Sequence, residues 1–326
     1  MAGEALERVV FFGTPDFALP TLDALVAAGR APVAVVSQPA RPAGRGRRLE
    51  EPPVARRARA LGLPLLQPEK VRAEPFLAEL AALRPEVVVV VAFGQIFPRA
   101  LLDLPAHGCI NLHASLLPRW RGAAPIQAAI AAGDRTTGVT TMQMEAGLDA
   151  GPILLQEEMA IGGEETAGEL GARLAERGAD LVVRTLAALE AGTLSPVPQR
   201  EADAAFAPRL TRASGRADWT LPAPALFDRL RAYTPWPGLW ATLREEPVKL
   251  VAARPLDGVP PRLDAASPRR DAPPGTILGL AGGGLAVACG GGTALGIETL
   301  QRPGRRALDA AVFANGERLR PGERLA

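Results

Sequence analysis

Two side chains that could take part in catalysis, Asn111 and His113, lie two positions apart in the strand-like segment GCINLHAS. Residues two apart on a strand point to the same face, so the amide and the imidazole lie side by side. Sites in open α/β sheets form beyond the carboxyl ends of the strands, where this pair could polarise a carbonyl and hold its developing oxyanion. The alternative is a core histidine that hydrogen-bonds to backbone groups.

The loop that follows, SLLPRWRG over residues 115–122, favours the functional interpretation, because it carries a tryptophan and two arginines that the local structure does not need. Asp149, in the glycine-rich loop EAGLDAG, is a second candidate. Held near His113, its carboxylate would stabilise the imidazolium and fix the tautomer of the ring. The alternative for Asp149 is an ordinary turn residue.

A third feature is the segment SQPARPAGRGRRLEEPP, residues 37–53, in which Arg41, Arg45, Arg47 and Arg48 are interleaved with proline and glycine. This composition predicts a loop. Arginine side chains on a loop suit contacts with phosphates and base edges. The alternative is a solvated loop without a ligand.

The elements that position these candidates alternate between strand and helix patterns in the first half of the chain. The alternation predicts a Rossmann-like, doubly wound, mostly parallel sheet, with the run VVVVV as a strand buried on both faces. The first turn, FFGTPDF, lacks the G-x-G-x-x-G spacing, which argues against a nicotinamide dinucleotide site. Strands are expected at 8–13, 31–38, 64–67, 86–94 and 108–115, and helices at 14–29, 51–62, 74–85 and 124–133.

The pattern changes beyond about Gly138. Two strands, 138–144 and 152–161, are followed by one long helical pattern over 166–192. Further along, short strands separated by glycine and proline turns predict a small, OB-like β-barrel. We therefore expect three parts: a catalytic domain over 1–192, a linker over 193–207 and a C-terminal β-barrel domain over 208–326.

The composition, with 48% hydrophobic residues, is typical of a globular protein. No apolar stretch reaches the length of a membrane span, and the N-terminus lacks the layout of a signal peptide. The two cysteines, Cys109 and Cys289, form no disulfide framework and have no metal-ligand spacing. The sequence thus predicts a cytoplasmic protein without a metal or a membrane partner.

The charge is unevenly distributed, although the net charge of the chain is only +2. Residues 208–326 contain 17 Lys and Arg against 11 Asp and Glu, whereas the remainder of the chain has an excess of acidic residues. A basic domain indicates a polyanionic partner, and the alternative is a basic surface that only keeps the domain soluble.

The chain resembles the methionyl-tRNA formyltransferase family in FFGTPDFALPTLDAL, QPARPAGRGRRL, VVVVVAFGQIFP, GCINLHASLLPRWRGAAPIQAAI and TGVTTMQMEAGLDAG. The resemblance extends into the C-terminal part through YTPWPGLW and PPGTIL. The N-x-H pattern with SLLP and a downstream aspartate is shared by enzymes that use 10-formyltetrahydrofolate. The segment LPRWRGAAPIQ, the arginine loop and the barrel are more specific to the tRNA enzymes.

This resemblance implies a formyltransferase fold in which Asn111, His113 and Asp149 form a catalytic trio. The trio would transfer the formyl group of 10-formyltetrahydrofolate to the methionine α-amine of charged initiator tRNA. Asn111 and His113 would stabilise the tetrahedral oxyanion, and Asp149 would tune His113 and help manage the protons. The implied folate cleft is lined by Ala92, Phe93, Gly94, Gln95, Ile96, Ser115, Leu116, Leu117 and Pro118.

For the tRNA, the resemblance implies that the loop centred on Arg45 enters the acceptor stem and that the basic barrel grips the flank. It also implies that the protein is a monomer. The implied tRNA contacts are Arg41, Arg45, Arg47, Arg48 and Arg209.

Three other functions compete with this one. A formyltransferase for an amino sugar or for glycinamide ribonucleotide would use the same trio but usually lacks the arginine loop and the barrel. A hydrolase of the folate donor would place water where the amine attacks. A non-catalytic RNA-binding protein would have no physical reason to keep all three trio residues.

Overall fold

The computed structural model describes residues 6–43, 48–256 and 272–326, and the side chains of 43 and 48 are not described. Its contacts divide the chain into two compact units. Unit 1 comprises residues 1–125, 136–160 and 169–207, and unit 2 comprises residues 126–135, 161–168 and 208–326.

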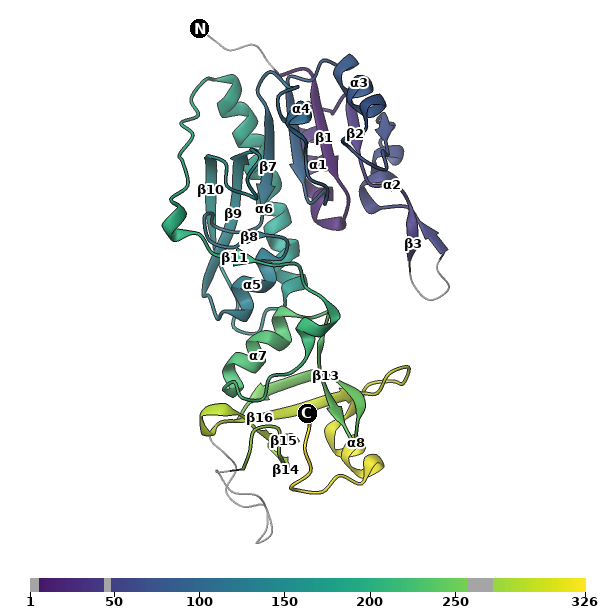
Figure 1. The fold of residues 1–326 in the computed structure, drawn as a ribbon, viewed down its shortest axis with the longest axis vertical. Helices are drawn as coiled ribbons and strands as arrows, with labels where there is room; N and C mark the ends of the chain where they lie inside the picture. The colour runs from purple at the N-terminus through teal and green to yellow at the C-terminus, as the bar shows by residue number, and fades with distance from the viewer. Residues whose placement is uncertain (1–5, 44–47, 257–271) are drawn as a thin grey trace. The chain divides into compact units, whose positions relative to one another are not determined.

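Unit 1 is built on a seven-stranded sheet, in the order β10-β9-β7-β6-β1-β2-β5 (Figure 1). The five strands β7, β6, β1, β2 and β5 run parallel to their neighbours, and β9 and β10 add an antiparallel edge. This confirms the expected mostly parallel, Rossmann-like sheet. The strands are β1 (Val9–Gly13), β2 (Ala34–Val36), β5 (Leu65–Leu66), β6 (Val87–Val91), β7 (Cys109–His113), β9 (Thr136–Gln143) and β10 (Ile153–Ala160).

Helices connect the parallel strands, as the alternating sequence pattern predicts. All five valines of β6 are buried, because a parallel strand is covered on both faces. The aromatic ring of Phe12, at the end of β1, packs against Phe93 and Phe97 at centroid distances of 5.1 and 5.0 Å. The helices of this part are α1 (Leu19–Ala27), α2 (Pro53–Ala60), α3 (Glu74–Ala82), α4 (Arg99–Leu102) and α5 (Pro125–Ala131), and the long α6 (Ala167–Glu190) follows β10.

The arginine-rich segment contains a short antiparallel strand pair where the sequence predicts a loop. Strands β3 (Arg41–Ala43) and β4 (Arg48–Glu50) pair with each other, with Arg41 opposite Glu50. The residue before a proline is restricted to extended conformations, so Arg41, which precedes Pro42, is already suited to a strand.

Residues 193–207, expected as a linker, are hydrogen-bonded to the rest of unit 1. Val197 bridges to Ile153 at the start of β10, and β11 (Phe206–Ala207) pairs in parallel with β8 (Arg121–Gly122). A short 3-10 helix, Glu201–Asp203, lies between these two contacts.

Unit 2 is a six-stranded antiparallel sheet in the order β12-β13-β16-β15-β14, with β17 paired to β16. This confirms the expected small β domain. Its core also contains two helices that the sequence pattern did not predict. Leu226 and Leu230 of α7 and Phe313 of α8 are buried in that core. The elements are α7 (Ala223–Ala232), β12 (Leu239–Leu243), β13 (Glu246–Pro255), β14 (Ile277–Ala281), β15 (Gly284–Ala288), β16 (Ala294–Gln301), β17 (Leu308–Asp309) and α8 (Ala310–Glu317).

Within the described ranges, no helix has both the length and the apolar character needed to cross a membrane.

Candidate active site

The last residues of β7 carry the predicted pair. Asn111 pairs in register with Met142 and His113 with Thr140, both on the antiparallel neighbour β9. Their spacing puts both side chains on one face, at the carboxyl end of a parallel strand. Asn111 is partly exposed, whereas His113 is buried, with 6% of its surface exposed.

His113 has two partners. Its Nε2 lies 2.9 Å from the carbonyl oxygen of Trp120, and because a carbonyl can only accept, Nε2 donates. Its Nδ1 lies 3.8 Å from Oδ2 of Asp149. The ring is thus fixed by a backbone group, as in a core histidine, and also faces a carboxylate. A proton on Nδ1 would point toward this carboxylate.

Asp149 comes from the loop between β9 and β10 and adopts a left-handed backbone conformation, with φ of 48°. Its Oδ2, the same atom that faces His113, accepts the backbone N–H of Gly122 at 2.8 Å. The structure therefore brings Asp149 and His113 together, and the loop after β7 holds the carboxylate through Gly122.

The loop 114–118 is fixed by polar side chains of the two antiparallel strands. Thr140 of β9 donates its hydroxyl to the Ser115 carbonyl at 2.6 Å and accepts the Leu117 N–H at 3.2 Å. Gln156 of β10 donates to the Leu117 carbonyl at 2.8 Å and to the Thr140 hydroxyl at 3.0 Å. Sequence reasoning missed Thr140 and Gln156; the only signal was their place on the strands next to β7.

The side chain of Ser115, predicted to line the folate cleft, is fully buried and donates to the Arg119 carbonyl at 2.6 Å. Leu117 is also buried, with 3% exposed, whereas Leu116 and Pro118 are partly exposed. Ser115 and Leu117 thus shape this loop through its interior, and any contact they make with a ligand would use the backbone.

The second predicted folate segment, residues 92–96, alternates between inward and outward positions. Ala92 and Gly94 are exposed and have positive φ, 48° and 86°, and Ile96 is 91% exposed. Phe93 points into the aromatic cluster, and its carbonyl accepts the Gln38 side chain at 2.9 Å. The outward positions therefore offer backbone and one aliphatic side chain to a ligand.

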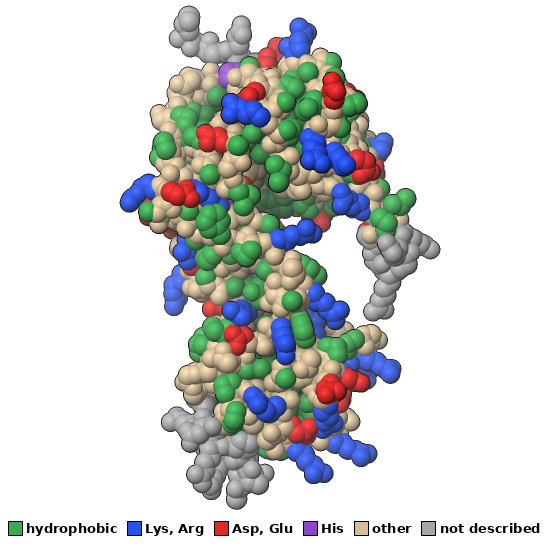
Figure 2. Space-filling view, in the orientation of Figure 1, with side chains coloured by type: hydrophobic (Ala, Val, Ile, Leu, Met, Phe, Trp, Pro, Cys, Tyr) green, Lys and Arg blue, Asp and Glu red, His purple; other side chains and the backbone are tan. Residues whose placement is uncertain are grey.

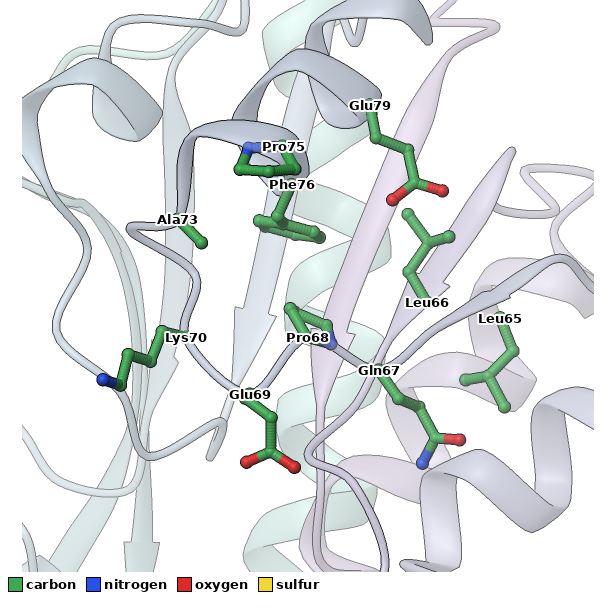
Figure 3. Close-up of a pocket in the computed structure, with 10 residues that line it drawn as sticks. All are labelled: Leu65, Leu66, Gln67, Pro68, Glu69, Lys70, Ala73, Pro75, Phe76 and Glu79. Carbon is green, nitrogen blue, oxygen red and sulfur yellow. The ribbon is translucent and has the colours of Figure 1, made fainter.

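Gln95 connects this segment to the strand–helix loop at residues 67–73. Its Oε1 accepts the Val71 N–H at 3.0 Å, and its Nε2 donates to the Glu69 carbonyl at 3.3 Å. That loop borders a pocket of about 510 Å³, which does not include the trio (Figure 3). The pocket is lined by Leu65, Leu66, Gln67, Pro68, Glu69, Lys70, Ala73, Pro75, Phe76 and Glu79.

The predicted tRNA-contacting arginines are spread over both units. Arg41 is exposed and donates to the Gln38 Oε1 at 2.8 Å. Arg45 and Arg47 lie outside the described residues, and of Arg48 only the backbone, in β4, is described. Arg209 is exposed in unit 2.

The geometry suits acyl-group chemistry. An imidazole and a carboxylate approach each other at the end of β7, and an amide lies two residues earlier on the same face of the strand, an arrangement that can hold an oxyanion and move a proton. Among the described residues, no group of three or more His, Cys, Asp or Glu side chains is placed to hold a metal ion.

Comparison with known proteins gives two matches to family models. "Formyl transferase" matches residues 7–186, and "Formyl transferase, C-terminal domain" matches residues 209–318. The methionyl-tRNA formyltransferase of Anaeromyxobacter dehalogenans is 50% identical over 311 residues, which cover 95% of this chain and 97% of that protein. That of Halorhodospira halophila is 51% identical over 316 residues, 97% and 98% of the two chains.

Among solved structures, the N-formyltransferase of Helicobacter canadensis, in complex with folinic acid and dTDP-3-aminofucose, shares the fold with a TM-score of 0.64. Its sequence is 12% identical, and the match covers 90% of this chain and 99% of that one. The sheet, the site and the two matches define a formyl transferase. The chain belongs to the methionyl-tRNA formyltransferase family, because about half of its residues are identical to those of these relatives over nearly the full length. This confirms the resemblance.

Proposed function

We propose that this chain transfers the formyl group of 10-formyltetrahydrofolate to the methionine α-amine of charged initiator tRNA, with Asn111, His113 and Asp149 as its catalytic residues. The observation that carries the proposal is the 3.8 Å approach of the His113 Nδ1 to the Asp149 carboxylate. This contact lies at the carboxyl end of β7, the strand that also carries Asn111, and α/β enzymes bind ligands at the carboxyl ends of their strands. Membership of the methionyl-tRNA formyltransferase family supplies the reaction.

In this reaction the amine attacks the formyl carbon and negative charge develops on the formyl oxygen. The N–H groups of the Asn111 side chain, on the same face of β7 as His113, are the proposed donors to that oxygen. His113 acts through its Nδ1, which faces Asp149, because its Nε2 donates to the Trp120 carbonyl. Asp149 also takes part in moving the proton that leaves the amine to the nitrogen that loses the formyl group.

For the folate, the exposed positions Ala92, Gly94 and Ile96 are the best placed of the predicted residues. A flat, largely apolar ring system packs on an aliphatic side chain while backbone groups supply hydrogen bonds. Phe93 and Gln95 support that surface from behind, because their side chains are engaged with the protein interior and with the 67–73 loop.

For the tRNA, the arginines of the 41–48 segment and the basic unit 2 are the proposed contacts. Arg and Lys side chains are spread over the face of unit 2 that Figure 2 presents. Phosphate contacts from unit 2 would account for affinity without sequence preference, so discrimination of the initiator would come from base contacts made by the 41–48 segment. The protein is proposed to be a cytoplasmic monomer.

The decisive assay mixes the protein and 10-formyltetrahydrofolate with initiator Met-tRNA, with elongator Met-tRNA or with an amino sugar nucleotide. We expect formylation of the initiator tRNA above the other acceptors. His113→Ala should lower kcat by about 100-fold or more, the range for loss of an acid–base group, while tRNA binding persists. Arg45→Ala is the control that should weaken tRNA use alone.

Turnover of His113→Ala near that of the wild type would remove His113 from the mechanism. Preferential formylation of the sugar nucleotide would replace the proposed substrate, and release of formate without an acceptor would indicate a hydrolase.

A further inference from the structure

Asp149 is held from a second side by Gln199, a residue in the stretch between the two family-matched regions, 7–186 and 209–318. The Gln199 Nε2 donates to the carbonyl of Asp149 at 2.8 Å and to the carbonyl of Gly151 at 2.7 Å. Both amide hydrogens are therefore spent on the backbone of a single loop, the one that carries the proposed catalytic carboxylate.

This loop needs such support. A residue with a Cβ rarely adopts the left-handed conformation that Asp149 has, with φ of 48°, and it persists only where its surroundings fix it. Two residues further on, a Cβ at Gly151 would lie 1.9 Å from the carbonyl oxygen of Gln143, so the loop crosses the end of β9 in close contact. Gln199 bridges the two carbonyls on either side of this turn.

Arg121 determines which way the Gln199 amide points. Its Nε donates to the Gln199 Oε1 at 3.0 Å, and because a guanidinium only donates, the amide oxygen must face it. The NH2 group then has to face the two carbonyls. Arg121 is 2% exposed, and its Nη1 pairs with the exposed Glu201 at 2.8 Å.

The same segment of chain also holds the carboxylate itself. Gly122, the residue after Arg121, donates its backbone N–H to the Asp149 Oδ2 at 2.8 Å. Residues 121–122 therefore hold Asp149 at two points: its side chain directly, and its main chain through Gln199.

We infer that Gln199, oriented by Arg121, is a positioning residue that keeps the Asp149 carboxylate in place against His113. The inference rests on the proposed role of Asp149 and extends it. In this role Gln199 acts on the backbone from which the carboxylate projects and not on a substrate. Its loss should therefore slow the chemical step and leave substrate binding intact, because small misplacements of a catalytic group are costly.

The test is the kinetics of Gln199→Ala and Gln199→Glu in the full chain. Both should lose roughly 10- to 100-fold in kcat, with KM for Met-tRNA and for the folate within about two-fold of wild type. The glutamate keeps the volume and the acceptor for Arg121, but it turns an acceptor oxygen toward the two carbonyls. If Gln199 only filled space, Gln199→Glu would turn over like the wild type, which would refute the inference.

Gln301→Ala is the matched control, because Gln301 also donates its amide to a backbone carbonyl, that of Arg305 at 2.8 Å, but in unit 2. It should keep the wild-type kcat. The thermal midpoint of each variant establishes whether it is folded. If Gln199→Ala does not fold, Gln199→Glu alone provides the test.

Asp149→Asn separates this inference from the proposed function. If Gln199 acts through Asp149, adding Gln199→Ala to Asp149→Asn lowers kcat no further, whereas an independent role gives multiplied losses and overturns the inference. If Asp149→Asn has a low kcat but Gln199→Ala turns over like the wild type, the inference is overturned while the proposed function stands. Turnover of Asp149→Asn near wild type would instead overturn the proposed function.

Discussion

The histidine at the end of β7 serves two structural requirements at once. Its Nε2 donates to the Trp120 carbonyl, which satisfies a buried ring and fixes its rotation, while Nδ1 is left facing Asp149. A core histidine and a catalytic histidine are therefore not exclusive interpretations of this residue. Chemistry that uses this ring has to proceed through the side that faces the carboxylate.

Two residues before Asn111 on the same face of β7, Cys109 is fully buried, and burial raises the pKa of its thiol to about 12. The pKa of Cys289 is likewise raised to about 12 by burial. Because only the thiolate reacts, we expect neither cysteine to react with a disulfide reagent at pH 8 in the folded protein. Both should react once the chain is denatured.

A thiol that reacts rapidly with the disulfide reagent in the native protein would contradict the burial of the two cysteines.

At the scale of elements, two neighbouring strands hold the loop that follows β7. The Thr140 hydroxyl uses its one hydrogen and both lone pairs, toward Ser115, Leu117 and Gln156. The antiparallel edge β9–β10 is thus more than cover for the sheet, because it fixes the backbone that the proposed folate site is built from.

A second element-level contact is the ion pair between Arg302, just after β16, and Glu317 at the end of α8. Their Nε and Oε1 atoms are 2.9 Å apart, and the hydrogen bond from Arg302 lowers the pKa of Glu317. A lowered carboxyl pKa stabilises the fold above the unfolded-state pKa, and that stability is lost as the pH falls through the folded-state pKa. Glu317→Gln should therefore cost about 1 kcal/mol of unfolding free energy at pH 7 and less at acidic pH.

Fluorescence of the tryptophans measures this, since Trp219, Trp236 and Trp240 all lie in unit 2. Glu246→Gln is the control: Glu246 pairs with the same arginine at 3.7 Å but is 76% exposed, so its loss should matter little. A pH-independent difference for Glu317→Gln would rule out the ion pair as the cause.

At the scale of the whole molecule, the two units differ in charge. The basic excess lies in residues 208–326, all of which belong to unit 2. The proposed chemistry and the proposed polyanion binding therefore belong to different parts of the chain, because the trio lies in unit 1 and the cationic excess lies in unit 2.

This division predicts a salt effect on one substrate only. Neutralised phosphates release counterions, so raising salt from 50 to 200 mM should raise KM for Met-tRNA by about 10-fold or more. KM for the folate donor should change by no more than about two-fold, because that site is expected to be mostly apolar with few charges. Equal salt dependence of the two KM values would contradict a separate electrostatic grip on the tRNA.

The sequence by itself determined the parallel sheet, the buried valine strand and the placing of Asn111 and His113 on one face. These follow from local periodicity, since alternation of side chains along a strand is a property of neighbouring residues. It also indicated the family through the segments around the trio. The arginine segment was expected as a loop but forms a strand pair, because cross-strand pairing is not visible in local composition.

Only the tertiary structure decided which distant groups meet. The antiparallel return of β9 brings the Asp149 loop back to the end of β7, and Gln199 reaches the same loop from a segment that reads as a linker. Thr140 and Gln156 became supports for the same reason. Contacts of this kind depend on strand order and register, which are set by packing of the whole sheet and not by any one stretch of sequence.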